Sequence, residues 1–530
     1  MKAYTSFSTK QTPQSEPIPD KPMVENSAGG FVFAIDDWQR LKRFLVLGTE
    51  GGTYYASERK ITKDNAECVI RCIKTDGIKT VNTIVEISNA GRAPKNDPAL
   101  FALAMCAGVG DTQTKRYALE NLSKVARTGT HLFHFVVYVK QFRGWGRALK
   151  RGIKEWYEFK TIDDLAYQVV KYQSRDKWSH RDLLRLAHPK TDDKERNSIY
   201  KWIVDSDVEA SPSVVEPAHK LIQGYRLAHS GEVKNKAQHI TDYNLQREMI
   251  PTEWLQEVGV WQALLEKMPM TAMIRNLATM TRVGLIAPMA KANKKIIASL
   301  TNKDILKKAR IHPITLLSAL KTYEQGHGER GKNTWEPISQ IVDALNDAFY
   351  LSFDIIEPTQ KRWLLALDVS GSMDMGNVSG IPSLTPRVAS SAMAMVTARV
   401  ESNYHIMAFS TDFIPLSISP KQRLDDICRK TGSLPFGGTD CAIPMLWAAQ
   451  NKIPVDVFTI YTDNETWAGK RHPCQALNQY RQKMGIPAKL IVVGMTATAS
   501  SIADSNDSGQ LDVVGFDTAT PQIISDFAKE

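Results

Sequence analysis

Five residues of the C-terminal third combine types that could bind a metal ion. Asp368, Ser370 and Ser372 stand at alternate positions immediately after a strongly apolar run, Thr439 follows two glycines, and Asp463 ends a second apolar run. Carboxylate and hydroxyl oxygens, with no Cys or His among them, form the donor set of a hard cation. We therefore expect these residues to bind one divalent cation, Mg²⁺ in first place and Mn²⁺ as the alternative, with a position left open for a partner's oxygen.

The same residues could also be read as a catalytic loop or as a turn. A serine nucleophile would need a GxSxG elbow and a histidine base, and neither accompanies Ser370. An aspartyl-phosphate mechanism at Asp368 would want a second carboxylate nearby, yet Ser370 stands two positions on. The structural alternative is a capped turn, because Asp and Ser often accept hydrogen bonds from helix N-termini. We expect no enzymatic use of this loop.

The segments that must position these residues alternate between two kinds. Short runs rich in Val, Ile and aromatic residues, such as RWLLALDVS and AKLIVVGMT, are separated by helical segments such as TPRVASSAMAMVTARVES. Strands that alternate with helices predict a doubly wound, Rossmann-like α/β domain with a parallel sheet, which we place at residues 359–530. In such a domain ligands bind at the carboxyl ends of the strands, where Asp368 and Asp463 stand.

The longer, preceding part of the chain has a helical pattern. From residue 29 to residue 358, segments such as DPALFALAMCAGV and HPITLLSALKTYEQG place apolar residues three and four positions apart. Pro and Gly punctuate these segments at intervals typical of helix pairs, which indicates an irregular helical-repeat array. Residues 1–28 are polar and lack an apolar run, and we expect them to form a disordered arm.

Charge is distributed unequally between these two parts. The whole chain has a formal net charge of +10. From residue 361 onward there are 15 Lys and Arg against 16 Asp and Glu, which leaves 52 against 41 in residues 1–360. The basic excess therefore lies entirely in the helical part, and it suggests a polyanionic partner.

Two neighbouring basic stretches of the helical part alternate with aromatic residues. Basic side chains four residues apart form a ridge on a helix, and such ridges beside aromatic rings suit RNA, whose phosphates bind charge and whose bases stack. The simpler interpretation is a solvated helix face with the tryptophans in the core. The candidate RNA-contacting residues are Arg147, Lys150 and Arg151 in the first stretch, and Lys171, Arg175, His180, Arg181 and His188 in the second.

Composition also bears on the location of the protein. The six cysteines are scattered and form no CxxC pair, which is typical of a reducing compartment without disulfides or a zinc site. The N-terminus lacks the apolar run of a signal peptide. The longest apolar stretch, Leu100–Gly110, is far shorter than the roughly 20 residues of a membrane helix. We expect a cytoplasmic protein with no membrane partner.

Several long motifs resemble a known family. The order DxSxS, T, D resembles the metal-ion-dependent adhesion site of von Willebrand A domains. Segments such as LGTEGGTYY, THLFHFV, WGRALKRGI and KWSHRDLLRLAH resemble the TROVE module of the Ro autoantigen family, and DVSGSM, GGTDC and FTIYTDNETWAG resemble its A domain. The likeness covers roughly residues 29–530, and the short connecting segments are similar to those of a bacterial member.

This resemblance implies a fold and a function. The helices would form a HEAT-like ring with a basic central hole, closed by the von Willebrand A domain. The protein, a monomer without catalysis, would bind small noncoding Y RNA on the outer ring and 3′ single-stranded ends of misfolded noncoding RNA in the hole. It would serve RNA quality control, rRNA maturation or decay, with polynucleotide phosphorylase or another exoribonuclease as a partner.

The resemblance also assigns residues. The family's RNA-contacting positions in the second basic stretch correspond to Lys171, Arg175 and His188, and the five oxygen-bearing residues correspond to its metal ligands. The A domain would offer its metal to an acidic protein ligand. One departure is an acidic insertion after Lys190, which puts contacts there in doubt.

Two other functions stay open from the sequence. The chain could be a metal-dependent protein–protein adhesion module with a structural helical part. It could also be a metal-dependent nuclease, although a two-metal hydrolytic site needs more carboxylates than this loop offers. RNA binding without metal would favour the scaffold, and magnesium-dependent shortening of RNA would favour the nuclease.

Overall fold

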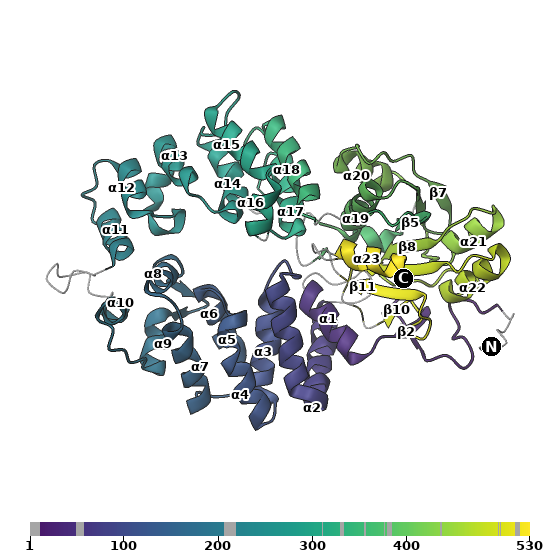
Figure 1. Ribbon diagram of the computed structural model, residues 1–530, viewed down its shortest axis with the longest axis horizontal. Coiled ribbons are helices and arrows are strands. Elements are labelled where there is room, and N and C mark those ends of the chain that lie inside the picture. The colour runs from purple at the N-terminus through teal and green to yellow at the C-terminus, as the bar shows by residue number, and fades with distance from the viewer. Residues whose placement is uncertain are drawn as a thin grey trace.

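The chain folds into a series of helices and an α/β domain, which together form a ring (Figure 1). This computed structural model describes residues 11–48, 58–205, 219–309, 311–328, 333–353, 357–375, 377–378, 384–434, 437–496, 498, 500–514 and 520–530. The predicted combination of a helical-repeat array and a doubly wound α/β domain is confirmed.

Helices make up almost all of the first part, as the apolar spacing predicts. Helix α2 is interrupted at Asp76, whose backbone is not helical. The helices are α1 Asp37–Leu47, α2 Glu58–Ala90, α3 Asp97–Val109, α4 Thr112–Glu120, α5 Leu122–Val125, α6 Gly129–Val139, α7 Arg147–Glu158, α8 Ile162–Lys171, α9 His180–Ala187, α10 Lys194–Asp205, α11 Lys220–His229, α12 Lys236–Tyr243, the 3₁₀ helices η1 Arg247–Met249 and η2 Thr252–Gln256, α13 Val258–Glu266, α14 Met270–Arg282, α15 Lys291–Leu300, α16 Lys303–Ala309, α17 Pro313–Glu324 and α18 Ser339–Leu351.

Local side-chain chemistry fixes where individual helices begin. At the start of α9 the Ser179 hydroxyl accepts a hydrogen bond from the N–H of Asp182, and the Asp182 carboxylate accepts one from the N–H of Ser179. This reciprocal capping box satisfies two N–H groups that a helix end would otherwise leave unpaired. Immediately before it, strands β3 (Ser174–Arg175) and β4 (Trp178–Ser179) form a small hairpin.

The helices form two arcs whose free ends meet the α/β domain. In Figure 1, α1–α10 lie along the lower arc, α11–α18 along the upper arc, and the α/β domain lies at the right between them. On the N-terminal side the buried Arg43 of α1 forms an ion pair with Asp512 of the domain. On the C-terminal side the Arg399 guanidinium lies 3.4 Å from the ring centroid of Tyr350 on α18. Contacts at both ends thus close the ring.

The α/β domain contains a six-stranded sheet in the order β11-β9-β8-β5-β6-β7, parallel except for β7. Its elements are β5 Trp363–Asp368, η3 Gly371–Asp374, α19 Pro386–Val400, β6 Tyr404–Phe409, β7 Phe413–Pro415, α20 Leu424–Gly432, α21 Ile443–Gln450, β8 Val457–Thr462, α22 Pro473–Met484, β9 Lys489–Gly494, β11 Gln510–Val514 and α23 Thr520–Lys529. Every residue of β5 and β8 is buried, which explains their continuous apolar sequence. The chain continues from β5 to β6 on one side and later adds β8 on the other. The switch point, where such sheets bind ligands, therefore lies between β5 and β8.

Residues 11–28 correct the expectation of a disordered N-terminal arm. Strand β1 (Met23–Glu25) pairs with β2 (Phe31–Ala34), and β2 pairs with β10 (Ser500–Ser501) of the α/β domain. The fully buried Gln14 donates hydrogen bonds to Asp440 Oδ1 and to a main-chain carbonyl of the same domain. This polar segment is ordered by partners more than 400 residues away, whereas residues 1–10 lie outside the described residues.

Two expectations from composition can be compared with the described residues. Each of the six cysteines has a free thiol, and Cys68 and Cys72 are buried on α2. Among the described helices, none is long and apolar enough to cross a membrane.

Candidate functional site

The first three predicted metal ligands lie in a loop that follows β5. Asp368 is the last residue of the strand, and its Oδ1 accepts a hydrogen bond of 2.9 Å from the N–H of Ser370. The hydroxyl oxygens of Ser370 and Ser372 are 3.1 Å apart. All three residues are buried. The alternate spacing seen in the sequence therefore brings three oxygen-bearing side chains together at the carboxyl end of one strand.

The fourth predicted ligand, Asp463, directly follows the neighbouring strand β8. Thr462, its last residue, donates a hydrogen bond of 2.7 Å to Asp368 Oδ2 and precedes the buried Asp463. Burial and the nearby Asp463 charge raise the pKa of Asp368 to about 7. Burial also raises the pKa of Asp463, against a hydrogen bond from Ser372. Two buried carboxyl groups thus share one site at which a cation would relieve their repulsion.

Thr439, the remaining predicted ligand, lies in the loop before α21. Its carbonyl accepts hydrogen bonds from the N–H groups of Trp467 (3.0 Å) and Ala468 (3.1 Å), so its loop is fastened to the loop that contains Asp463. The Thr439 hydroxyl is fully buried, and among the described residues it has no hydrogen-bond partner. A buried hydroxyl without a partner is costly, and a bound cation would supply the missing interaction.

The donor set fits a hard cation and not a zinc-type site. Within the described ranges, no group of three or more His, Cys, Asp or Glu residues is arranged to hold a metal ion. A cation here would therefore depend on hydroxyl oxygens as well as the two carboxylates, which suits Mg²⁺ better than Zn²⁺. The proximity of Asp368, Ser370, Ser372 and Asp463 agrees with the sequence prediction, and metal binding itself stays a prediction.

Arg387 of α19 positions the metal-site loop and was not anticipated from the sequence. This buried guanidinium donates to both carboxylate oxygens of Asp374 (2.5 and 2.6 Å), to the Val369 carbonyl (3.3 Å) and to the Thr431 carbonyl (2.6 Å). It therefore holds the loop at its beginning and at its end. Both oxygens of the Asp374 carboxylate are thereby engaged in holding the loop.

The first basic stretch forms helix α7. Arg147 and Arg151 are exposed and Lys150 is half-buried. Glu155 forms an ion pair with Arg151 at 2.8 Å, so part of the positive ridge is neutralised on its own helix. Trp156 is buried, as expected for a core tryptophan. The ridge exists, but it is less positive than its basic residues alone suggest.

The second basic stretch covers the end of α8, the β3–β4 hairpin and α9, which packs against α7. The Arg175 side chain is 63% exposed and lies 3.8 Å from Asp176. Lys171 is mostly buried. Its Nζ donates hydrogen bonds to Tyr167 Oη (2.8 Å) and Gln246 Oε1 (2.7 Å). Arg175 is therefore available to a ligand, whereas Lys171 already links α8 to the segment after α12.

His180 corrects one predicted RNA contact. It is 2% exposed, and its Nδ1 lies 2.7 Å from Tyr157 Oη. Its ring stacks on Trp156 with an interplanar angle of 25°. Burial lowers the pKa of His180 to about 3, so it is neutral at physiological pH. His180 is a core residue that anchors the start of α9, and it offers RNA neither charge nor surface.

The remaining predicted residues lie at and beyond the end of α9. Arg181 is half-buried, and His188 is exposed. His188 adopts a left-handed backbone conformation (φ 49°), and its N–H donates to the Leu184 carbonyl, which ends the helix. In the acidic insertion after Lys190, the Asp193 carboxylate accepts hydrogen bonds from two N–H groups of α10. The insertion thus caps a helix, and the doubt about RNA contacts there stays open.

Comparisons with known proteins cover nearly the whole chain. The TROVE domain model matches residues 24–223 and 242–322, and the Ro60 vWA domain model matches residues 362–528. The RNA-binding protein RO60 of Deinococcus radiodurans is 45% identical over 520 residues, which is 98% of this chain and 97% of that protein. The protein of that name from Caenorhabditis elegans is 37% identical over 97% of this chain and 91% of its own length. The crystal structure of the Deinococcus radiodurans RO (RSR) protein matches with a TM-score of 0.71 and 44% identity, covering 93% of this chain and 99% of that one.

Proposed function

Because this chain belongs to the Ro60 family, we propose that it is the RNA-binding protein of a ribonucleoprotein. In this proposal the helical part binds the RNA. Two relatives that match over nearly their full lengths are named RNA-binding proteins. The observation that carries the proposal is the location of the basic excess, 52 Lys and Arg against 41 Asp and Glu in residues 1–360. Phosphate contacts by such residues supply most of the affinity of RNA-binding proteins at moderate salt.

The RNA is, in this proposal, a small noncoding Y-type RNA bound outside the ring, together with single-stranded 3′ ends that enter the ring. Two exposed residues of the second basic stretch support the outer surface, Arg175 in the β3–β4 hairpin and His188 at the end of α9. The protein acts without catalysis of its own and presents RNA to a 3′→5′ exoribonuclease for quality control, maturation or decay.

A divalent cation at the carboxyl end of the sheet forms the second half of the proposal. Two buried carboxyl groups and a buried hydroxyl without a partner among the described residues support it. When bound, the cation supplies positive charge and a coordination position that a carboxylate of a partner protein can occupy. The residues that would hold it are Asp368, Ser370, Ser372, Thr439 and Asp463.

Ultraviolet crosslinking in cells, followed by sequencing of the bound RNA, tests the RNA half. The expected result is an enrichment of small structured noncoding RNA, with crosslinked peptides in residues 147–190. The variant Arg175→Ala removes an exposed charge of the predicted RNA surface and should reduce the yield of crosslinked RNA. Crosslinks confined to the α/β domain, or no RNA above the background of an untagged strain, would contradict the proposal.

A further inference from the structure

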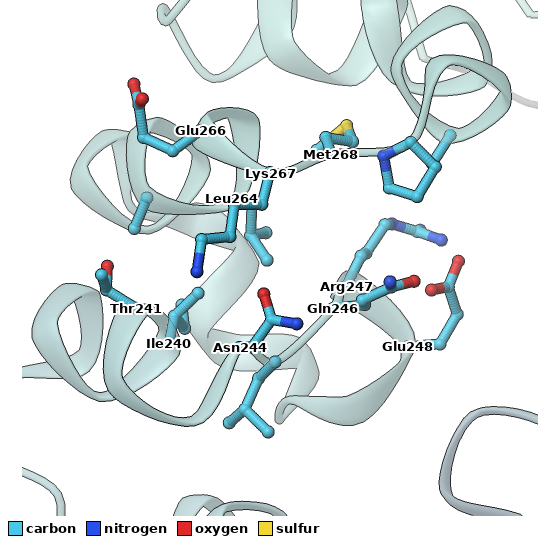
Figure 2. Close-up of a pocket in the computed structure, with 14 residues that line it drawn as sticks. Ile240, Thr241, Asn244, Gln246, Arg247, Glu248, Leu264, Glu266, Lys267 and Met268 are labelled. Carbon is cyan, nitrogen blue, oxygen red and sulfur yellow. The ribbon is translucent and has the colours of Figure 1, made fainter. Parts of the chain in front are cut away.

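A pocket between helices α12 and α13 lies next to the second basic stretch. It has a volume of about 190 Å³ and is lined by residues of α12, η1, α13 and the beginning of α14. Figure 2 shows Asn244, Gln246 and Lys267 around the same space, with Leu264 and Met268 beside them. Because pockets for drug-sized ligands occupy about 300–1,000 Å³, this one suits a smaller fragment.

The orientation of Gln246 is fixed by residues outside the pocket. Its Oε1 accepts hydrogen bonds from Tyr167 Oη (2.9 Å) and Lys171 Nζ (2.7 Å), and both are donors to this atom. The side-chain amide must therefore present its NH₂ group on the other side, because only the oxygen can accept. Within the described residues this NH₂ group donates no hydrogen bond. Gln246 is thus a positioned donor.

Arg247 and Lys267 of the lining are also donors, whereas Thr241 and Asn244 can donate or accept. Arg247 Nε is buried without a hydrogen-bond partner in the described part of the chain, and Lys267 contributes an ammonium group. The two carboxylates at the rim already have cationic neighbours: Glu248 lies 3.9 Å from Lys171, and Glu266 pairs with a lysine of α15 at 2.8 Å. Among the described residues, the Gln246 NH₂ group and Arg247 Nε are therefore the donors left open to a ligand that carries acceptors.

The larger apolar side chains of the lining are Ile240, Leu245, Leu264, Met268 and Pro269. Apolar walls with a few positioned donors suit a flat ring whose edge carries carbonyl oxygens. Unstacked nucleobases of RNA have this shape and chemistry, and proteins read them on their edges. The hydrogen bond from Lys171 to Gln246 joins the pocket to the start of the second basic stretch, so an RNA bound along that stretch would lie close to the pocket.

We infer that this pocket binds one unstacked nucleobase of the bound RNA and favours a base with a carbonyl acceptor, uracil or guanine, over cytosine. The inference rests on the proposed RNA-binding function and adds a base preference to it. Uracil and cytosine have the same size, but uracil presents O4 as an acceptor where cytosine presents an amino donor. The Gln246 NH₂ group complements the first and opposes the second.

The test compares the affinities of fluorescent U10 and C10 RNA for the full-length protein and its variants at one low salt concentration. The expected result for the natural sequence is roughly tenfold tighter binding of U10. Gln246→Glu keeps the oxygen that Tyr167 and Lys171 contact and replaces the NH₂ group by an acceptor. This variant should abolish or invert the preference. Ala272→Leu, which fills the pocket from α14, should bring the affinity ratio close to one.

Gln262→Glu is the matched control, because Gln262 is an exposed residue of α13 outside the pocket lining and receives the same added charge. It should lower both affinities equally and leave their ratio unchanged. Equal affinities of U10 and C10 for the natural protein, or a ratio that survives both pocket variants, would overturn the inference. No binding of either RNA would instead refute the RNA-binding function itself.

Discussion

The helical part and the α/β domain hold their polar side chains in opposite ways. The Arg175 side chain of the helical part is 63% exposed, whereas Asp368 and Asp463 of the α/β domain are each 1% exposed. The helical part has a large positive excess, and the α/β domain has almost no net charge. A polyanion is bound by many exposed charges whose positions need little precision. A small cation needs a few oxygens that the fold has already desolvated and aligned.

Because of this difference, we expect the two parts to respond differently to perturbation. Binding to exposed charges should change gradually with salt and with the number of charges removed. Binding to a buried oxygen set should be lost when one ligand or one positioning residue is removed.

The largest effect is expected from salt on RNA binding. Because each phosphate contact releases counterions, log affinity should fall linearly with log salt concentration. For 6–10 contacts the loss between 50 and 200 mM salt is about a thousandfold or more. Filter binding or fluorescence anisotropy over this range measures the slope. An affinity that does not depend on salt would show that the basic excess of residues 1–360 does not bind phosphates.

The next effect is the removal of the Arg387 guanidinium. Arg387→Met keeps the length of the side chain but leaves Asp374 and the carbonyl of Val369 without their donor. The guanidinium is buried, but the Asp374 side chain is 39% exposed, so losing these hydrogen bonds should cost about 2 kcal/mol of the free energy of unfolding. Urea denaturation should show this loss, and Mn²⁺ affinity should fall because the ligand loop is no longer held. The variant should still bind RNA if it is folded. Unchanged stability and Mn²⁺ affinity would remove Arg387 from its positioning role.

How much of the fold follows from the sequence depends on how local each signal is. Apolar spacing three and four residues apart predicted the helices, and the short apolar runs predicted β5 and β8, because both signals lie within single elements. Residues 11–28 were misjudged because their polar composition indicates disorder. Their order comes from Gln14 and from pairing with β10, which are contacts across most of the chain.

The candidate site shows the same limit. The spacing of Asp368, Ser370 and Ser372 was informative because all three belong to one loop. Thr462 could have been suspected, since it directly precedes Asp463. Arg387 has no charged neighbour in its part of α19, and no local signal points to its partners. His180 was mistaken for a surface residue because its neighbours in sequence are basic. Its burial is decided by Tyr157 and Trp156, which belong to another helix.

A smaller effect is expected from His188, an exposed residue of the proposed RNA surface. His188→Asn suits the left-handed backbone, which Asn tolerates, and removes the imidazole without disturbing the helix end. Affinity for a structured Y-type RNA should fall roughly tenfold, the scale of one lost contact, with little change for a single-stranded RNA. Gel shifts with both ligands measure the difference. Equal losses would mean that the two kinds of RNA share one surface.

The smallest effect concerns the pH dependence of stability in the helical part. His134 lies between Asp97 (Nδ1 to Oδ1, 2.7 Å) and Asp176 (Nε2 to Oδ2, 3.3 Å), and Asp97 raises the pKa of His134. Because the folded-state pKa lies above the unfolded value of about 6.5, this stabilisation is complete below pH 6.5 and is lost as pH rises through the raised pKa.

Urea denaturation of the natural protein and of His134→Gln checks this expectation. The natural protein should be more stable by about 1 kcal/mol at pH 5.5, and the difference should shrink above pH 8. A difference that grows with pH would mean that neutral His134 is the stabilising form.

The division of labour between the two parts is tested most directly by Asp368→Ala, studied by Mn²⁺ titration and by RNA gel shift on the same preparation. The substitution removes a carboxylate that the buried oxygen set needs, while every predicted RNA-contacting residue lies in the helical part. We predict that Mn²⁺ binding is lost and that RNA affinity in the absence of metal changes less than twofold. Unchanged Mn²⁺ binding would contradict the metal site. Loss of RNA binding by a variant with native circular dichroism would show that the α/β site takes part in RNA recognition, and the two parts would not have separate functions.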